Sequence, residues 1–243
     1  MKTKTLLLTL VLLVFAGLMG SCTKEEKGNT SVKFQAVNTG ARLKTSAAAG
    51  VVVNTFKVNI SEIEFEFWDD DDDKYQDGLT FSELELSGPF EIDLVKNGNM
   101  QLNDLVAGIT LPETGFDEIE FEFETSRIRT SELFGKSILV KGTINGKPFE
   151  YFSTIDEFEV EIEFEEPVNL TQANGVTVII SIDLAAIFDS SRGGVDISGA
   201  TDGNGNGTIE IHLNDNDGNR TLADRLDDAI WNAIDTIEDR WDD

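Results

Sequence analysis

Apolar and polar residues alternate in many short stretches between residues 31 and 184, and most stretches end at glycine, asparagine, aspartate or proline. A period of two is typical of β-strands that turn one face to a core and the other to water. Many such strands separated by turn residues predict a mainly β fold, an antiparallel β-sandwich. The clearest alternation lies in residues 32–36, 56–60, 63–67, 119–123, 158–164 and 176–182.

Two dipeptides predict where the chain changes direction. Asn145-Gly146 lies between "ILVKGTI" and "KPFEYF" and suits the type I′ turn of a β-hairpin. Gly88-Pro89 separates "LTFSELELS" from "FEIDLV", as expected at a sheet corner or where the chain switches strands.

The spacing becomes helical near the C-terminus. Residues 191–243 are expected to form an Asp/Asn/Gly-rich loop, a strand at "TIEIHL" and an amphipathic C-terminal helix that follows the sandwich domain of residues 31–190. A helix of this kind usually docks on its own domain, and a partner-binding helix is the alternative. Its apolar stripe consists of Leu222, Leu226, Ile230, Ala233, Ile234, Ile237 and Trp241.

Rows of glutamate accompany the apolar strand positions. The letters "EIEFEF" occur at residues 62–67 and again at 118–123, and "VEIEFE" occurs at 160–165. Alternate acids on a strand lie ~7 Å apart. That spacing falls within the ~6.5–9.5 Å range of an inverting glycosidase pair, but any strand with alternating acids has it. A general acid also needs a carboxyl shielded from water. A solvated outer face is therefore the first interpretation, and a carboxylate-dependent glycan hydrolase is the alternative.

The acidic strands would repel each other if they paired directly. If they were direct neighbours, like charges would face each other across the ladder and destabilise it. We therefore expect basic stretches such as "SRIRT" and "SILVKG" to lie between the acidic strands, or cations to collect beside them.

The N-terminus carries features of an export signal. Lys2 and Lys4 precede a mostly apolar run over residues 6–18, which is short of the ~20 residues of a membrane-spanning helix. Gly20 and Ser21 stand directly before Cys22, which resembles the lipobox of bacterial lipoproteins. Residues 1–21 are thus expected to be a signal peptide. The alternative is an ordinary cleavage site before an unpaired thiol.

The lipobox resemblance implies that Cys22 is acylated, with palmitate among the expected lipids, and that residues 22–30 form the lipidated cysteine and its tether. Several acyl chains give stable anchoring where one gives only marginal binding. The sequence "KEE" after Cys22 resembles the surface-export signal of Bacteroidota lipoproteins. The expected location is therefore the cell outer membrane, lipid-anchored and exposed at the surface.

Charge and rare residues exclude several kinds of function. The net charge is −27, and it becomes −29 once residues 1–21, with two lysines and no acids, are removed. Such a molecule repels nucleic acid and attracts divalent cations. One cysteine and one histidine, His212, exclude a disulfide and a zinc site built from these residue types. No phosphate-binding loop or dinucleotide motif is present.

One loop has the spacing of metal ligands. In "DGNGNGTIE", Asp202, Asn204, Asn206 and the Thr208 carbonyl occupy positions 1, 3, 5 and 7 of an EF-hand-type calcium loop. Position 12, which needs a bidentate acid, is Leu213. Calcium is thus the one cofactor expected, with a plain Asn-Gly turn as the alternative. The acidic stretch "WDDDDDK" at residues 68–74 is expected to be a solvated turn, with a weak calcium site as its alternative.

The longer motifs resemble a family of Bacteroidota secreted lipoproteins of unknown function with a transthyretin-like β-sandwich. The resemblance spans about residue 56 to the C-terminus, and it rests on "ISEIEFEF", "LELSGPFEIDLV", "LPETGFDEIEFEFE", "ILVKGTINGKPFEYF", "VTVIISIDLAAIF" and "TDGNGNGTIEI". It implies an envelope location and no catalytic residue. The expected function is non-enzymatic: surface binding, adhesion or a structural role, with an envelope protein or a glycan as the partner.

Overall fold

The computed structural model describes residues 29–38, 50–67, 83–110, 116–156, 158–168 and 176–235. The predicted signal peptide, Cys22 and residues 68–74 lie outside these ranges, as do Ile237 and Trp241 of the predicted helix. Within them the protein is mainly β, with two sheets and one long helix near the C-terminus. This confirms the expected structural class. None of the described helices is both long and apolar enough to span a membrane.

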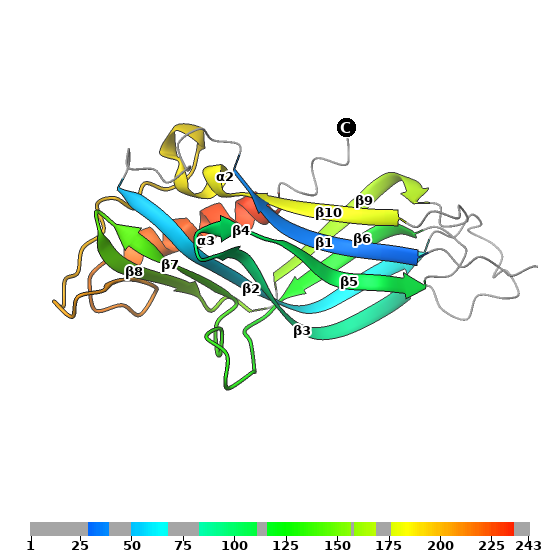
Figure 1. Ribbon diagram of the computed structural model, residues 1–243, viewed down its shortest axis with the longest axis horizontal. Helices are drawn as coiled ribbons and strands as arrows, with labels where there is room; N and C mark the ends of the chain where they lie inside the picture. Colours follow the sequence, from blue (N-terminus) through cyan, green and yellow to red (C-terminus); the bar gives the residue numbers. More distant parts are fainter. Residues whose placement is uncertain are drawn as a thin grey trace, which may run out of the picture.

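The smaller sheet, sheet A, has three strands. β1 (Asn29–Val37) lies in its centre, between β10 (Val176–Asp183) and β5 (Leu102–Thr110). β1 runs parallel to β10 and antiparallel to β5. Figure 1 shows this sheet lying over one half of the larger sheet.

The larger sheet, sheet B, is organised by the long strand β2 (Val51–Phe67). Along one edge, the first half of β2 pairs with β7 (Ile138–Ile144) and the second half with β6 (Phe116–Phe123). β3 (Glu83–Lys96) pairs with β2 along the other edge. The remaining strands are β4 (Asn99–Met100), β8 (Lys147–Ser153), β9 (Phe158–Val168) and β11 (Ile209–Ile211). β9 pairs with β6, and β11 joins β8 in a parallel pair.

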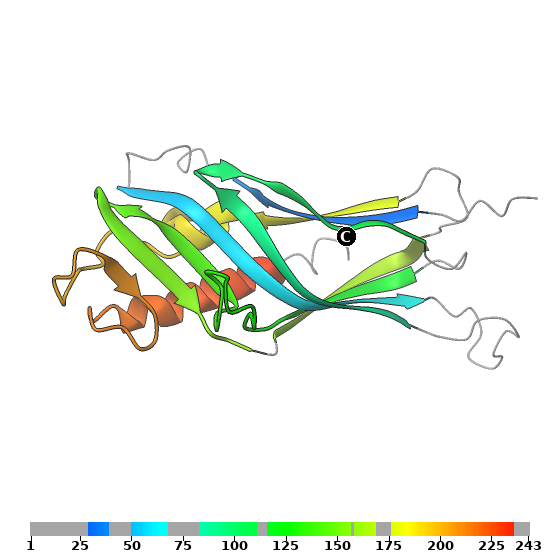
Figure 2. The same ribbon diagram turned by 60° about the horizontal axis from the view of Figure 1, so that its bottom comes forward.

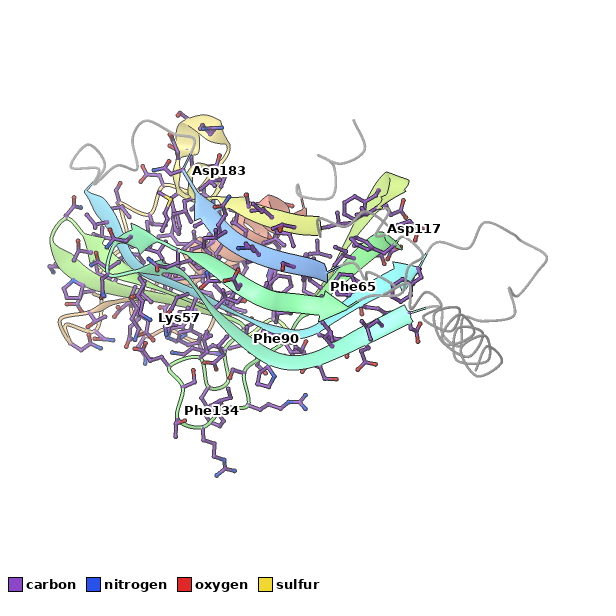
Figure 3. The ribbon with its side chains drawn as sticks, turned by 45° about the vertical axis from the view of Figure 1, so that its right-hand side comes forward. Lys57, Phe65, Phe90, Asp117, Phe134 and Asp183 are labelled. Atoms are coloured by element: carbon purple, nitrogen blue, oxygen red, sulfur yellow. The ribbon has the colours of Figure 1, made fainter. Side chains whose placement is uncertain are left out.

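The apolar strand positions form the core, as the alternation predicted. Ile63 and Phe65 of β2 are completely buried, and Phe65 is labelled on β2 in Figure 3. The Phe34 ring of sheet A meets the Phe121 ring of sheet B edge-on, with centroids 5.6 Å apart. The core is therefore shared by both sheets.

The C-terminal helix α3 (Arg220–Asp235) packs against sheet B beside β7 and β8 (Figure 2). Leu226 and Ile230 are fully buried. The Tyr151 hydroxyl of β8 donates a 2.6 Å hydrogen bond to Asp227 Oδ1, and the Trp231 ring lies 5.6 Å from that of Phe123. The described part of the helix thus docks on its own domain. Two short helices, α2 (Leu184–Phe188) and η1 (Ser190–Arg192), follow β10.

The Asn145-Gly146 turn is confirmed, whereas the prediction that the chain switches strands at Gly88-Pro89 is wrong. Asn145 and Gly146 have φ values of 51° and 81°, as a type I′ hairpin turn requires. Gly88-Pro89, in contrast, does not end a strand, because β3 continues through it from Glu83 to Lys96. The opposite segment of β2 shifts register between Ile60 and Glu62. This bulge absorbs the irregularity, and the ladder continues.

Candidate functional site

The predicted calcium-loop residues lie in the Asp/Asn loop, which we define as residues 202–219. Backbone N–H groups donate to its side-chain oxygens: Asn206 N to Asn204 Oδ1 and Thr208 N to Asn206 Oδ1, both at 2.9 Å. Gly207 N donates to Asp202 Oδ2 at 3.1 Å. Such short-range bonds are the turn chemistry expected of Asp and Asn. They hold Asp202, Asn204, Asn206 and Thr208 in one compact loop.

Asp217 closes this loop, although sequence reasoning did not select it as a site residue. Its carboxylate accepts from Asn204 N at 3.0 Å and from Glu210 N at 2.7 Å, and the residue is 6% exposed. A side chain at Gly203 would come within 2.4 Å of the Asp217 carbonyl oxygen. The glycine therefore allows the two arms of the loop to touch. Asp217 thus pins the loop through backbone N–H groups rather than standing in for the acid missing at Leu213, and "NDNDGN" was the available sequence signal.

Two carboxylate oxygens of the loop are buried without a hydrogen-bond partner in the described part of the chain, namely Asp202 Oδ1 and Asp215 Oδ2. The other oxygen of Asp215 accepts three backbone N–H bonds, from Asp217, Gly218 and Asn219, at 2.7–3.1 Å. A buried acceptor without a partner costs about 1–3 kcal/mol. Carboxylate oxygens are the ligands that calcium prefers. A cation beside either carboxylate would satisfy an oxygen that the described residues leave unpaired.

The repeated "EIEFEF" motifs come together elsewhere, on the outer side of sheet B. Here β3, β2, β6 and β9 are direct neighbours, and their glutamates stand opposite one another in rows. We call this surface the glutamate face. Its rows are Glu62, Glu122 and Glu159; Glu85, Glu64, Glu120 and Glu161; and Glu83, Glu66, Glu118 and Glu163.

The expectation that basic strands separate the acidic ones is therefore wrong. "SILVKG" contributes β7, which pairs with the first half of β2, whereas the glutamates occupy the second half. "SRIRT" lies in the connection between β6 and β7. Hydrophobic alternation fixes which side each glutamate faces. It contains no information about which strands become neighbours.

Burial and mutual repulsion raise the pKa values of several carboxyls on the glutamate face. Burial, then a hydrogen bond and repulsion from Glu85, raise the pKa of Glu62 to about 7. Burial together with repulsion, first from Glu66, raises the pKa of Glu118 to about 7. The pKa values of Glu64 and Glu120 are raised for the same reasons. Part of the face is thus protonated near neutral pH, which relieves the repulsion.

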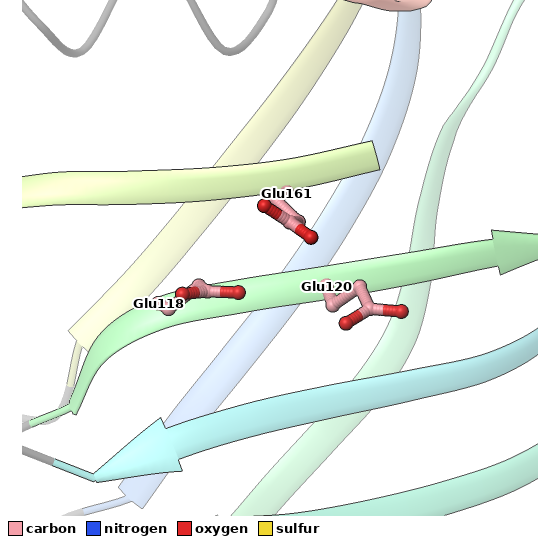
Figure 4. A group of neighbouring side chains, drawn as sticks. All are labelled: Glu118, Glu120 and Glu161. Carbon is pink, nitrogen blue, oxygen red and sulfur yellow. The ribbon is translucent and has the colours of Figure 1, made fainter. Parts of the chain in front are cut away.

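Three of these carboxylates approach each other closely. Oxygens of Glu118, Glu120 and Glu161 all lie within 4.8 Å of one another, and Figure 4 shows them on neighbouring strands β6 and β9. None of the three lines the pocket between β8 and the Asp/Asn loop or the pocket beside Pro89. A trio of acids on an open sheet does not by itself define a metal or catalytic site.

Charge removal tests this description of the glutamate face. We expect Glu118→Gln to raise the melting temperature at pH 8 by about 1–4 °C, because each like-charge pair across a ladder costs about 0.2–1 kcal/mol. The matched control is Glu132→Gln. Lys141 holds the pKa of Glu132 below its usual value through a 2.9 Å bond, so this variant should melt slightly lower. Calorimetry measures both, and stabilisation by both or by neither contradicts the description.

The chain matches no protein-family model, no curated protein and no solved structure. Similarity therefore assigns no role to any residue. The functional conclusion depends on the geometry of the carboxylates described above.

Proposed function

We propose that the protein is a non-enzymatic, lipid-anchored binding protein of the cell outer membrane, and that its Asp/Asn loop binds calcium. The observation that carries the calcium proposal is the pair of buried, unpartnered oxygens on Asp202 and Asp215. The lipobox-like residues before Cys22 support the anchor, and the net charge of −27 favours cations over nucleic acid. Membership of the Bacteroidota secreted lipoprotein family is part of the same proposal.

We also propose that the fold is a predominantly antiparallel β-sandwich. Support comes from the core shared by the two sheets and from the ring contact between Phe34 and Phe121. The parallel pairs β1–β10 and β8–β11 are exceptions within this arrangement. In this proposal sheet A covers one half of sheet B, and α3 covers the other half.

A glycan hydrolase is the competing function, and one observation favours it. The pKa values of Glu62 and Glu118, at about 7, suit a general acid. These carboxyls, however, belong to rows of acids on a sheet surface that repel each other, and neither lines the pocket between β8 and the Asp/Asn loop or the pocket beside Pro89. Turnover of a glycan that is lost in Glu118→Gln would favour the hydrolase over the binding protein.

Calcium binding is tested by comparing thermal unfolding in chelator with unfolding in excess calcium. At a calcium concentration 100 times the Kd, binding stabilises the fold by about 2.7 kcal/mol. For a chain of this size, that corresponds to a rise of roughly 5–10 °C in the melting temperature. Magnesium should stabilise less, because it requires a tighter octahedral site.

Two variants and one control locate the effect. Asp202→Ala and Asp215→Ala should each remove most of the calcium-dependent gain, whereas Asp224→Asn, an exposed acid on α3, should retain it. Isothermal titration with calcium chloride should show one tight site that is lost in the two loop variants. Equal gains in all four proteins would place calcium on the general acidic surface and refute the loop site.

A further inference from the structure

Asn219, the last residue of the Asp/Asn loop, joins three parts of the chain. Its Nδ2 donates to the carbonyls of Thr201 and Glu210, both at 2.8 Å, and its Oδ1 accepts from Thr201 N at 3.1 Å. Its backbone carbonyl accepts from Leu222 N and Ala223 N in the first turn of α3. An asparagine before a helix usually caps that helix with its own side chain. This amide instead links the entry of the loop and β11 to the start of α3.

Asp215, one of the two carboxylates proposed to bind calcium, is bonded directly to this junction. Its Oδ1 accepts from Asn219 N at 3.1 Å, whereas its Oδ2 is buried without a partner among the described residues. Asp217 adds a second connection, because one of its oxygens accepts from Asn204 N and the other from Glu210 N. The loop thus holds both backbone groups of Glu210, the central residue of β11, through Asp217 and Asn219.

The position of β11 depends on these bonds because its pairing is short. It has three residues, Ile209–Ile211, in a parallel pair with β8 at the edge of sheet B. A pairing of this length at a sheet edge is among the parts of a fold that open most readily. In Figure 2 the loop and β11, in orange, lie at one end of the molecule beside the start of α3. An opening of the loop would therefore release β11 and the first turn of α3 together.

The proposed calcium ligands connect the ion to this opening. Asp202 Oδ1 and Asp215 Oδ2 are buried in the closed loop, so calcium reaches them only when the loop opens. An ion bound in the closed loop then opposes each further opening. We propose that calcium acts as a clamp that holds β11 against β8 and keeps the first turn of α3 in place. This proposal rests on the calcium site proposed above and adds the elements that the ion controls.

The clamp also determines the shape of a pocket of about 230 Å³ between β8 and the Asp/Asn loop. β8 supplies one wall and the loop supplies the other. The lining residues are Glu150, Phe152, Asn206, Thr208, Glu210 and His212. The rings of Phe152 and His212 stack between the two walls, with centroids 4.3 Å apart. Release of β11 would separate these rings and remove one wall, so the pocket is complete only while the loop is closed.

Hydrogen–deuterium exchange of the full chain in chelator and in calcium chloride tests the clamp. At a calcium concentration 100 times the Kd, an opening that releases the ion becomes about 100-fold rarer. Backbone amides of residues 209–211 and 222–223 should therefore exchange up to about 100-fold more slowly in calcium. β4 lies at the opposite edge of sheet B, and the amides of Asn99 and Met100 should exchange equally fast in both solutions.

One variant and one control test the junction. Asn219→Ala removes the side-chain links to Thr201 and Glu210 but keeps the carboxylates of Asp202 and Asp215. It should still bind calcium in isothermal titration, whereas the slowing at residues 209–211 should fall from about 100-fold to less than about tenfold, because β11 can then open without releasing the ion. Asn214→Ala replaces an exposed asparagine of the same loop and should respond like the wild type.

His212 provides a second measurement that needs no variant. It is the only histidine of the chain, so its ring protons give unique NMR signals. Calcium should shift and sharpen these signals, because the ring is then held against Phe152.

The outcomes separate this proposal from the calcium site itself. Calcium binding without slower exchange at residues 209–211, or with unchanged His212 signals, overturns the clamp and leaves the site in place. Equal slowing in Asn219→Ala and the wild type also overturns the clamp, because the junction would then carry no coupling. If the titration shows no calcium binding, both proposals fail.

Discussion

Replacing Cys22 with alanine is expected to release the protein from the membrane fraction completely. The thiol of Cys22 is the only one in the chain, and lipoprotein acylation requires it. Without acyl chains, a molecule with a net charge of −29 after cleavage is repelled by anionic lipid headgroups. Membrane association would therefore fall from nearly all of the protein to nearly none. Fractionation and metabolic palmitate labelling measure the effect.

Thr23→Ala is the matched control, because it changes the neighbouring residue and retains the thiol. It should be labelled and sediment with membranes like the wild type. Mass spectrometry of the wild-type protein should find a mature N-terminus at an acylated Cys22. Palmitate labelling that persists in the Cys22 variant would refute the anchor, and the N-terminus would then be an ordinary secretory one.

The strands were largely predictable because burial of one face imposes alternation on the sequence. Ile119, Phe121 and Phe123 are all buried, as their spacing requires. β5 was missed, because "LNDLVAGIT" at Leu102–Thr110 has no regular alternation. The parallel pairing of β1 with β10 could not be predicted from the sequence either. It joins segments more than 140 residues apart, and no local property specifies such a pairing.

The candidate sites were predictable only where their residues are close in sequence. Asp202, Asn204 and Asn206 could be selected by spacing, but the role of Asp217 depends on how the loop folds back.

The glutamate face, too, could be predicted only in part from the sequence. Its residues were recognised in the sequence as a solvated surface, and their outward direction follows from the pleat. Their assembly into opposed rows follows from pairing between β2, β6 and β9, which brings residues 64, 120 and 161 together. The resulting repulsion is a property of the fold rather than of any one strand. It should therefore be visible in the stability of the whole protein.

We accordingly expect the protein to be more stable at pH 5 than at pH 8. The pKa values of Glu62 and Glu118 rise from 4.5 to about 7 on folding, and those of Glu64 and Glu120 also rise. Between pH 4.5 and 7 the folded state thus binds more protons than the unfolded state. The free energy of unfolding increases as the pH falls through this window. Burial also raises the pKa of Asp227, with the same sign.

Carboxylates with lowered pKa values act in the opposite direction, but at lower pH. Lysine partners lower the pKa values of Asp93 and Glu132. Their stabilisation is present above their unfolded pKa values of about 4 and is lost only below them. The maximum of stability should therefore lie near pH 5. Calorimetric unfolding across pH 4–9 locates it.

The size of this effect follows from the partial exposure of the glutamate face. Each protonation is worth on the order of 1 kcal/mol or less because water screens the charges, so several together raise the melting temperature by several degrees. The double variant Glu118→Gln, Glu120→Gln should flatten the profile between pH 5 and 8. At pH 8, 1 M sodium chloride should reproduce part of the gain, because the Debye length falls to about 3 Å. A melting temperature that rises steadily from pH 5 to pH 8 would mean that the glutamates do not repel each other as their register requires.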